Sequence, residues 1–289
     1  MSAPTTGAAL PGLLLHLSGP LQSWGHHSHF NERDTAPFPT RSGIIGLLAA
    51  ALGRARGEDV DDLADLSTTV RVDRAGVLLR DLHTVGGGLP RAQTVTTAEG
   101  GKRSADATTL LSHRYYLADA AFTVAVTGRP DHPDHAALLD RCVTALRHPN
   151  WPLYLGRRAC PPAGPLFLGS SDDVLPHLVG LPIAAPAPRN PGHSPGQAVE
   201  FLSDRPLNDL PVPDNITSSE GDEAAHVAAR INDQPITFPP RTRAYRARPQ
   251  YRRTLTPPAS QWAGYATAYL TALHAYTITR LTTAEGSRR

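Results

Sequence analysis

The sequence has few of the residues that define several protein classes. Lys102 is its one lysine and Met1 its one methionine, and Cys142 and Cys160 are its two cysteines, neither in a metal-binding or disulfide motif. So little cysteine excludes a disulfide framework and favours a reducing compartment. The apolar run at residues 13–17 is too short for a signal peptide or a membrane span. We therefore expect a cytoplasmic protein with no membrane partner.

Arginine, in contrast, is abundant, because all but one of the 28 lysines and arginines are arginines. Arginine binds phosphate through a planar fork and stacks on bases, which favours an RNA partner. A GC-rich genome explains the same ratio, and the net charge of +2 alone indicates no polyanionic partner. A hydrophobic content of 40% and a length of 289 residues fit a soluble globular chain with one large domain or two small ones.

One run near the N-terminus is especially informative. An apolar strand predicted at residues 13–17 breaks at Gly19 and Pro20, and Gln22 and Trp24 follow. An amide and an indole beside a glycine suit single-stranded nucleic acid, whose unstacked bases can be contacted and stacked upon. We predict that Gln22 and Trp24 line the floor under such bases, with ordinary turn formation as the alternative interpretation.

A helix is predicted to begin after residues 37–40, capped by Thr40 or Ser42, and to end at Gly53. Its first free N–H groups and its dipole favour an anion, and Arg41 adds a charge-assisted contact. We predict an RNA phosphate site formed by Arg41 and the backbone amides of Ser42 and Gly43. Ordinary helix capping explains Thr40 and Ser42 equally well.

Two further stretches combine glycine or aromatic residues with arginine. In the turn Gly156-Arg157-Arg158, glycine lets another backbone approach closely and two arginines follow. Residues 241–253 interleave six arginines with Tyr245 and Tyr251 and contain no acid, which is a stronger electrostatic signal for nucleic acid. Surface arginines on a solvated segment are the alternative in both places.

Residues 83–112 hold two glycine clusters and almost no large apolar side chain before Leu110, so they cannot form core. They are either a disordered loop or an arm that orders on a partner. Alternation at 91–97 indicates an extended β-hairpin limb. Strand–helix–strand patterns flank this arm, the second with a helix at 134–146, and this order fits a ferredoxin-like α+β domain. A terminal helix is predicted over 260–281.

Catalytic and metal motifs are scarce. The histidines at 26–29 match no standard metal spacing, and no cysteine or carboxylate cluster accompanies them. We expect no metal and no cofactor. His113, Arg114, Tyr115 and Tyr116 could supply the base, acid and cation of a metal-independent ribonuclease, although such residues at a strand start more often pack or hydrogen-bond.

Several colinear motifs resemble the CasD family of type I-E CRISPR Cascade subunits, over about residues 12–250. They are Leu15-x-Leu17-x-Gly19-Pro20-x-Gln22-x-Trp24-Gly25, Phe38-Pro39-Thr40-Arg41-Ser42-Gly43 with the apolar helix after it, Asp81-Leu82-His83-Thr84-Val85, Arg114-x-Tyr116-Leu117-x-Asp119, Tyr154-Leu155-Gly156-Arg157-Arg158-x-Cys160-Pro161 and a weaker Ile236-Thr237-Phe238-Pro239.

This resemblance implies a ferredoxin-like (RAMP/RRM-like) domain that binds the 5′ handle of crRNA at one end of the Cascade backbone. It implies a β-hairpin thumb over about 83–112 that reaches over the RNA and toward the neighbouring backbone subunit, and Arg91, Lys102 and Arg103 are the candidate site residues of this thumb. The implied partners are crRNA, the backbone subunits, the large subunit and, through the complex, target DNA. Members of type I-E are not the processing nuclease, whereas a type I-C relative cuts RNA.

We therefore predict a non-catalytic RNA-binding subunit in CRISPR antiviral defence, with a metal-independent endoribonuclease as the alternative. The handle phosphates would be held by Arg41, the amides of residues 42–43, Arg114 and the turn at 156–158. We predict a ferredoxin-like domain at 12–180, a small, loop-rich C-terminal β region at 181–254, and a helical extension at 255–289.

Overall fold

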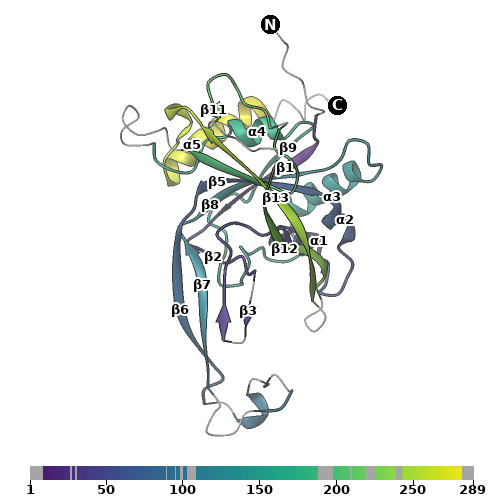
Figure 1. The fold of residues 1–289 in the computed structure, drawn as a ribbon, viewed down its shortest axis with the longest axis vertical. Helices are drawn as coiled ribbons and strands as arrows, with labels where there is room; N and C mark the ends of the chain where they lie inside the picture. The colour runs from purple at the N-terminus through teal and green to yellow at the C-terminus, as the bar shows by residue number, and fades with distance from the viewer. Residues whose placement is uncertain are drawn as a thin grey trace.

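The computed structural model describes residues 9–281 except 27, 30, 89, 95, 98–99, 103–108, 188–197, 209, 219–225 and 239–242. Over these residues the fold is a mixed α/β arrangement of two mostly antiparallel sheets with few helices (Figure 1).

Four strands form the centre of the larger sheet, in the order β9-β1-β8-β5, and each is antiparallel to its neighbours. They are β1 (Gly12–Ser18), β5 (Ser67–Arg74), β8 (Ala121–Thr127) and β9 (Phe167–Ser171). The connection from β1 to β5 contains the helices α1 (Arg41–Leu52) and α2 (Asp61–Asp65), and that from β8 to β9 contains α3 (His135–Arg147). Two strand–helix–strand units therefore interleave in one sheet.

The continuous apolar run in β1 is explained by cover on both faces of the sheet, which removes the usual alternation with polar residues. Leu13, Leu15 and Leu17 belong to the core that contains α1 and α3. Leu14 belongs to a second core on the opposite face. That core contains α4 (Leu175–Gly180) and α5 (Ala266–Tyr276).

Both predicted ends of α1 are confirmed. Thr40 is the N-cap, and its hydroxyl accepts a hydrogen bond from the Gly43 N–H at 3.3 Å. Gly53 is the C-cap in the left-handed conformation, with φ +78°, which glycine adopts without a Cβ penalty. The helix predicted at 134–146 forms as α3, shifted by one residue.

A long hairpin projects from the body (Figure 1). Its strands β6 (Val77–Val85) and β7 (Leu110–Ala118) pair without interruption from Val77 opposite Ala118 to Val85 opposite Leu110. The extended limb predicted at 91–97 is wrong, because Arg91–Gln93 form a 3₁₀ turn, η1, between the two strands. The other edge of β7 pairs with β2 (Leu21–Gln22) and, in parallel, with β4 (Glu32–Arg33), which pairs with β3 (Ser28–His29).

The C-terminal half extends the larger sheet from its β5 edge. β10 (Val199–Ser203) pairs with β5, and β13 (Ala244–Thr256) pairs with β10, β11 (Thr217–Ser218) and β12 (Val227–Thr237). The region predicted at 181–254 therefore shares a sheet with the N-terminal strands. The β12–β13 ribbon runs downward in Figure 1, as the β6–β7 hairpin does.

The predicted terminal helix forms, but in a shorter version. A 3₁₀ turn, η3 (Ala259–Gln261), precedes α5, and a wider turn, η4 (Thr277–Leu281), follows it. Tyr269 and Leu273 bury this helix against the second core. Over the residues described, no helix has both the length and the hydropathy needed to cross a membrane.

Candidate nucleic-acid interface

The opening run folds into the protein interior. Gln22 is fully buried and Trp24 is 1% exposed. The Gln22 side-chain amide donates to the Leu17 and Ala120 carbonyls at 3.0 and 2.9 Å, and its oxygen accepts from the Trp24 indole N–H at 3.0 Å. The prediction that these two side chains lie under RNA bases is therefore wrong. After the break at Gly19 and Pro20 the chain re-enters a sheet as β2, which places both polar groups inside.

Gly43 serves the packing of this tryptophan. A Cβ at Gly43 would lie 2.7 Å from Cε3 of Trp24, which is closer than carbon atoms can pack. The Ser42 hydroxyl lies 3.4 Å from the Thr40 hydroxyl at the helix start. The capping interpretation thus accounts for Thr40 and Ser42, and Gly43 is needed where α1 crosses the indole ring.

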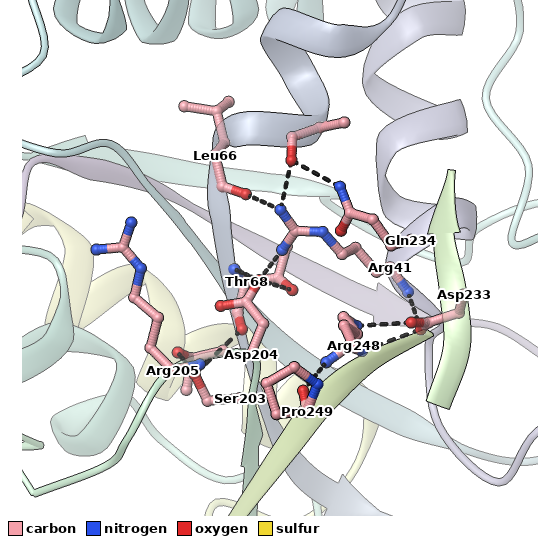
Figure 2. A network of polar contacts seen from close by, with 12 residues as sticks. Arg41, Leu66, Thr68, Ser203, Asp204, Arg205, Asp233, Gln234, Arg248 and Pro249 are labelled. Carbon is pink, nitrogen blue, oxygen red and sulfur yellow. Dashed lines mark hydrogen bonds and ion pairs between the residues drawn. The ribbon is translucent and has the colours of Figure 1, made fainter. Parts of the chain in front are cut away.

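Arg41 is buried and holds several segments together (Figure 2). Its guanidinium forms an ion pair with Asp204 and donates to the carbonyls of Ala64 and Leu66, where α2 ends. Its side chain is about as buried as that of Asp204, at 6% and 9% exposure. Burial lowers the pKa of Arg41 to about 10, so the guanidinium stays protonated at neutral pH. The prediction that Arg41 contacts an RNA phosphate is wrong, because its charge is used inside the chain.

The anion expected at the start of α1 is present, but it is a side chain of the same protein. The Arg41 backbone N–H donates to Oδ2 of Asp233 at 2.8 Å. The same carboxylate accepts from Nε and Nη2 of Arg248 at 2.6 and 2.9 Å, and Asp233 is 2% exposed. The helix N-terminus therefore favours a negative charge as predicted, and β12 supplies it. The lone acid among the arginines of this region was the sequence signal for this ion pair.

The turn at Gly156 differs, because its arginines reach the surface. Gly156 has φ +89°, and a Cβ there would lie 1.8 Å from the Ser23 carbonyl oxygen. Glycine is thus required both by conformation and by close backbone approach. Arg158, which follows Arg157, is exposed and has no hydrogen bond or ion pair with a described residue.

Arg157 lies over an aromatic ring. Its guanidinium carbon is 4.9 Å from the centroid of the Tyr116 ring, a cation–π distance. Nη2 donates to the Arg33 carbonyl at 2.8 Å, while Nη1 is shielded from solvent and has no partner among the described residues. The guanidinium is therefore held in place with part of its donor capacity unused.

Arg114 lies near this stack. It is two residues before Tyr116 on β7, so the two side chains share one face of the strand. It is half-buried, is opposite Asp81 on β6 and Arg33 on β4, and its Nε has no partner among the described residues. The structure thus brings together Arg114 and the Gly156 turn from two motifs distant in sequence.

The residues expected on the arm are only partly described. Lys102 is exposed and donates from Nζ to the Thr94 carbonyl at 2.8 Å. The backbone of Arg91 lies in η1, and Arg103 lies outside the described residues. The β6–β7 hairpin also carries exposed large apolar side chains, namely Val77, Leu78, Leu79, Leu82 and Leu111.

His113 sits on the face of β7 opposite Arg114. Its Nδ1 lies 2.8 Å from Oε1 of Glu32 and its Nε2 lies 2.9 Å from Nη2 of Arg80. The hydrogen bond from His113 is the main cause that lowers the pKa of Glu32. Because Arg80 can only donate, Nε2 accepts, and its lone pair is occupied. Tyr115 shares the His113 face of β7 and lies opposite Arg80, whereas Arg114 and Tyr116 lie on the other face, so the residues proposed for a ribonuclease are divided between the two faces of the strand.

Asp65, His132 and His135 form a group with metal-ligand chemistry. Nδ1 of His135 accepts the Arg129 backbone N–H at 2.9 Å, and its Nε2 lies 3.0 Å from Oδ2 of Asp65. A neutral imidazole that accepts at Nδ1 carries its proton on Nε2, so Nε2 has no lone pair for a metal. The contacts instead suit a hydrogen bond from His135 to Asp65.

Comparisons with known proteins agree with this arrangement. Residues 12–251 match the family model described as CRISPR-associated protein (Cas_Cas5). The chain is 34% identical over 249 residues to the CRISPR system Cascade subunit CasD of Escherichia coli (strain K12), covering 81% of this chain and 92% of the relative. The chain belongs to the Cas5 family of CRISPR-associated proteins.

Solved structures agree with the family. A chain of a CRISPR RNA-guided surveillance complex is 39% identical, with a TM-score of 0.73 over 92% of this chain and 99% of that chain. A second structure, titled as the crystal structure of a Cas protein, is 33% identical, with a TM-score of 0.54 over 87% of this chain and 97% of that chain.

Proposed function

We propose that this protein is a non-catalytic, RNA-binding subunit of a CRISPR Cascade-type surveillance complex in antiviral defence. It holds the 5′ handle of crRNA and caps one end of the assembly. One observation carries the proposal. Arg157 lies over Tyr116 with an unpartnered Nη1, while Arg114 shares that face of β7 and Arg158 is exposed next in the chain.

The chemistry of this face suits an RNA backbone. Guanidinium groups form charge-assisted hydrogen bonds to phosphate oxygens, and the ring under Arg157 limits its motion before RNA binds. The left-handed turn at Gly156 fixes where the two arginines leave the backbone. The turn is positioned by the interior, because Gly156 packs on the backbone of Ser23, which lies between the buried Gln22 and Trp24.

The fold supports the same function. The strand order β9-β1-β8-β5, with α1 and α3 as connections, supports our assignment of a ferredoxin-like domain of the RAMP type. We assign the β6–β7 hairpin as the thumb that crosses the RNA.

The apolar side chains of the hairpin suit a protein partner. Val77 is 71% exposed and Leu82 is 59% exposed, and exposed apolar patches mark interaction surfaces. We assign this surface to a neighbouring backbone subunit, with the large subunit and target DNA reached through the complex. A cytoplasmic location accords with Cys142 and Cys160, which are free and buried.

The double variant R157A/R158A of the full chain tests the RNA site. The affinity for single-stranded repeat RNA is measured across a salt series, and we expect weaker binding with a salt slope smaller by about 0.7 for each lost phosphate contact. The control is R141A, an exposed arginine of α3 with 62% side-chain exposure. Affinity and slope equal to those of R141A would remove the turn from the site.

The ribonuclease alternative has a separate test. Purified protein is incubated with repeat RNA in EDTA, and we expect intact RNA because the ring nitrogens of His113 face Glu32 and Arg80. Site-specific cleavage that is lost in H113A would overturn the non-catalytic assignment.

A further inference from the structure

The β12–β13 ribbon concentrates the positive charge of the chain. Seven arginines and a single acid, Asp233, lie between residues 226 and 258, whereas the net charge of the whole chain is +2. The rest of the chain is therefore net negative. Charge of one sign gathered on one element indicates a polyanionic partner for that element.

Three of these arginines hold the ribbon to the body. Arg248 forms the two-pronged ion pair with buried Asp233, and Nε of Arg252 lies 2.7 Å from Oε1 of Glu200. Nη1 of Arg253 donates to the carbonyls of Leu207 and Leu210 at 2.9 and 3.2 Å. These contacts are a structural use of arginine and need no ligand.

Three others have no such use. Arg230 on β12, Arg246 on β13 and Arg243 just before β13 are exposed. None forms a hydrogen bond or ion pair with another residue of the described part of the chain. The one acid on the ribbon cannot offset their charge, because Asp233 is buried and already paired with Arg248.

The ribbon is anchored at its base to the start of α1 and to the end of α2. Asp233 binds both Arg248 and the first N–H of α1, and Nε2 of Gln234 donates to the Ala64 carbonyl at 2.9 Å (Figure 2). From this base the two strands pair along their lengths and run past the helices (Figure 1). The backbone that carries these arginines is thus held in place, so binding need not order the chain itself, which lowers that part of the entropy cost.

We propose that the β12–β13 ribbon, through Arg230, Arg243 and Arg246, binds the phosphodiester backbone of a nucleic acid at a second site, separate from the Gly156 turn. Guanidinium groups on an exposed ribbon contact phosphates without reading bases, so this binding is independent of sequence and sensitive to salt. Single-stranded RNA and duplex DNA share the phosphodiester chemistry, and the two arms of the experiment distinguish them.

The test uses the full chain and the double variant R230A/R246A. Its control, R56A/R141A, removes two exposed arginines near α2 and on α3 and so changes the net charge equally. Binding to a single-stranded RNA and to a DNA duplex of unrelated sequence is measured across a salt series. Two lost contacts lower the salt slope by about 1.4 for the single strand or by about 1.8 for the duplex.

A smaller slope in the RNA arm assigns the ribbon to RNA, and a smaller slope in the duplex arm assigns it to DNA. Slopes equal to those of the control in both arms overturn the proposal. The variant R230K/R246K keeps the charge and should restore the slope, which separates lost phosphate contacts from altered folding. In an R157A/R158A background the ribbon effect should persist, so failure at the Gly156 turn and failure at the ribbon are distinguishable.

Discussion

The start of α1 and the turn at Gly156 both have an arginine within two residues of a glycine, yet the two arginines have opposite environments in the fold. At the start of α1, Arg41 is 5% exposed and its charge is matched by Asp204. At the turn, Arg158 is exposed and Arg157 keeps an unpartnered Nη1 within the described structure. An arginine in a motif is thus available to a ligand only where the fold supplies no carboxylate or helix end of its own.

A second buried arginine supports this interpretation. Arg71 is 1% exposed, pairs with Asp73, and donates to the carbonyls of Leu178 and Leu181 at 2.8 Å, where α4 ends. Arg41 binds the end of α2 in the same manner. A cation stabilises the negative end of a helix and satisfies its last carbonyl groups. Arg41 therefore satisfies the carbonyl groups at the end of α2 on one face of the sheet, and Arg71 satisfies those at the end of α4 on the other face.

The largest expected effect is on stability, at Arg41. Arg41→Ala leaves Asp204 buried without its partner and should lower the free energy of unfolding by about 3–5 kcal/mol. Urea denaturation measures it, with Arg54→Ala as the control, since the more exposed Arg54–Asp62 pair should contribute about 1 kcal/mol or less. If the folded Arg41→Ala variant bound RNA with a smaller salt slope than the wild type, Arg41 would contact RNA, and the start of α1 would not differ from the Gly156 turn.

The pH dependence of stability probes the buried interior in the same way. Burial lowers the pKa of His16 from 6.5 to about 4 in the folded chain, so the unfolded chain binds more protons between these values. We expect the contribution of neutral His16 to the free energy of unfolding to be fully present above pH 6.5. It should fall by about 3 kcal/mol as the pH drops to 4. His16→Gln should flatten this slope in denaturation curves, and His135 and His177, whose pKa values are also lowered by burial, should account for the remainder. An unchanged slope in His16→Gln would contradict the assignment.

Gln22 gives a third test of the interior. Gln22→Leu removes the acceptor of the Trp24 indole and the donor to two buried carbonyls. Each unsatisfied buried group costs about 1–3 kcal/mol, so the melting temperature should drop clearly, and RNA affinity per folded molecule should stay constant. The matched change at an exposed amide, Gln93→Leu, should leave the melting temperature unchanged. If a fully folded Gln22→Leu variant bound RNA weakly, Gln22 would be part of the RNA-binding interface after all.

At the turn, two glycines separate conformation from close approach. Gly156 and Gly164 both have positive φ, at +89° and +110°, but a Cβ at Gly164 would meet no atom within 4 Å. Gly164→Ala should therefore cost only conformational strain, about 1–2 kcal/mol. Gly156→Ala must also displace the turn from Ser23, so it should lose more stability and weaken RNA binding. Thermal melting measures the stability of both variants, and RNA titration measures their affinity. Equal losses of stability in Gly156→Ala and Gly164→Ala would argue against a close contact between Gly156 and the Ser23 carbonyl.

The smallest expected effect is at Arg157. Arg157→Lys keeps the charge, so the salt slope for RNA should not change. The lysine loses most of the stacking on Tyr116 and the fork geometry, and affinity should fall by about two- to fivefold, since an exposed cation–π contact contributes about 0.5–1 kcal/mol. Fluorescence anisotropy with labelled RNA resolves this change. If Arg157→Lys reduced the salt slope of RNA binding as far as Arg157→Ala does, the lysine would have lost the phosphate contact itself, which contradicts the expectation that only stacking and fork geometry are lost.

The local elements could be predicted from the amino-acid sequence, because the signals for a helix end, a strand or a loop lie in neighbouring residues. Thr40 and Gly53 set the ends of α1, the uniform apolar run at 13–17 indicated a strand, and the lack of core residues at 83–112 indicated a loop or an arm outside the core. The colinear motifs also indicated the family, which the match over residues 12–251 confirms.

Which motif side chains are available to a ligand depends on packing between segments that are distant in sequence. Asp233 lies 192 residues from Arg41 in sequence and still supplies the carboxylate at the start of α1, and no local pattern encodes such a pairing. Likewise, the ring of Tyr116 and the carbonyl of Arg33 come to Arg157 from separate strands. Burial of a charge depends on which distant groups compensate it, and that is settled when the sheet and its helices pack.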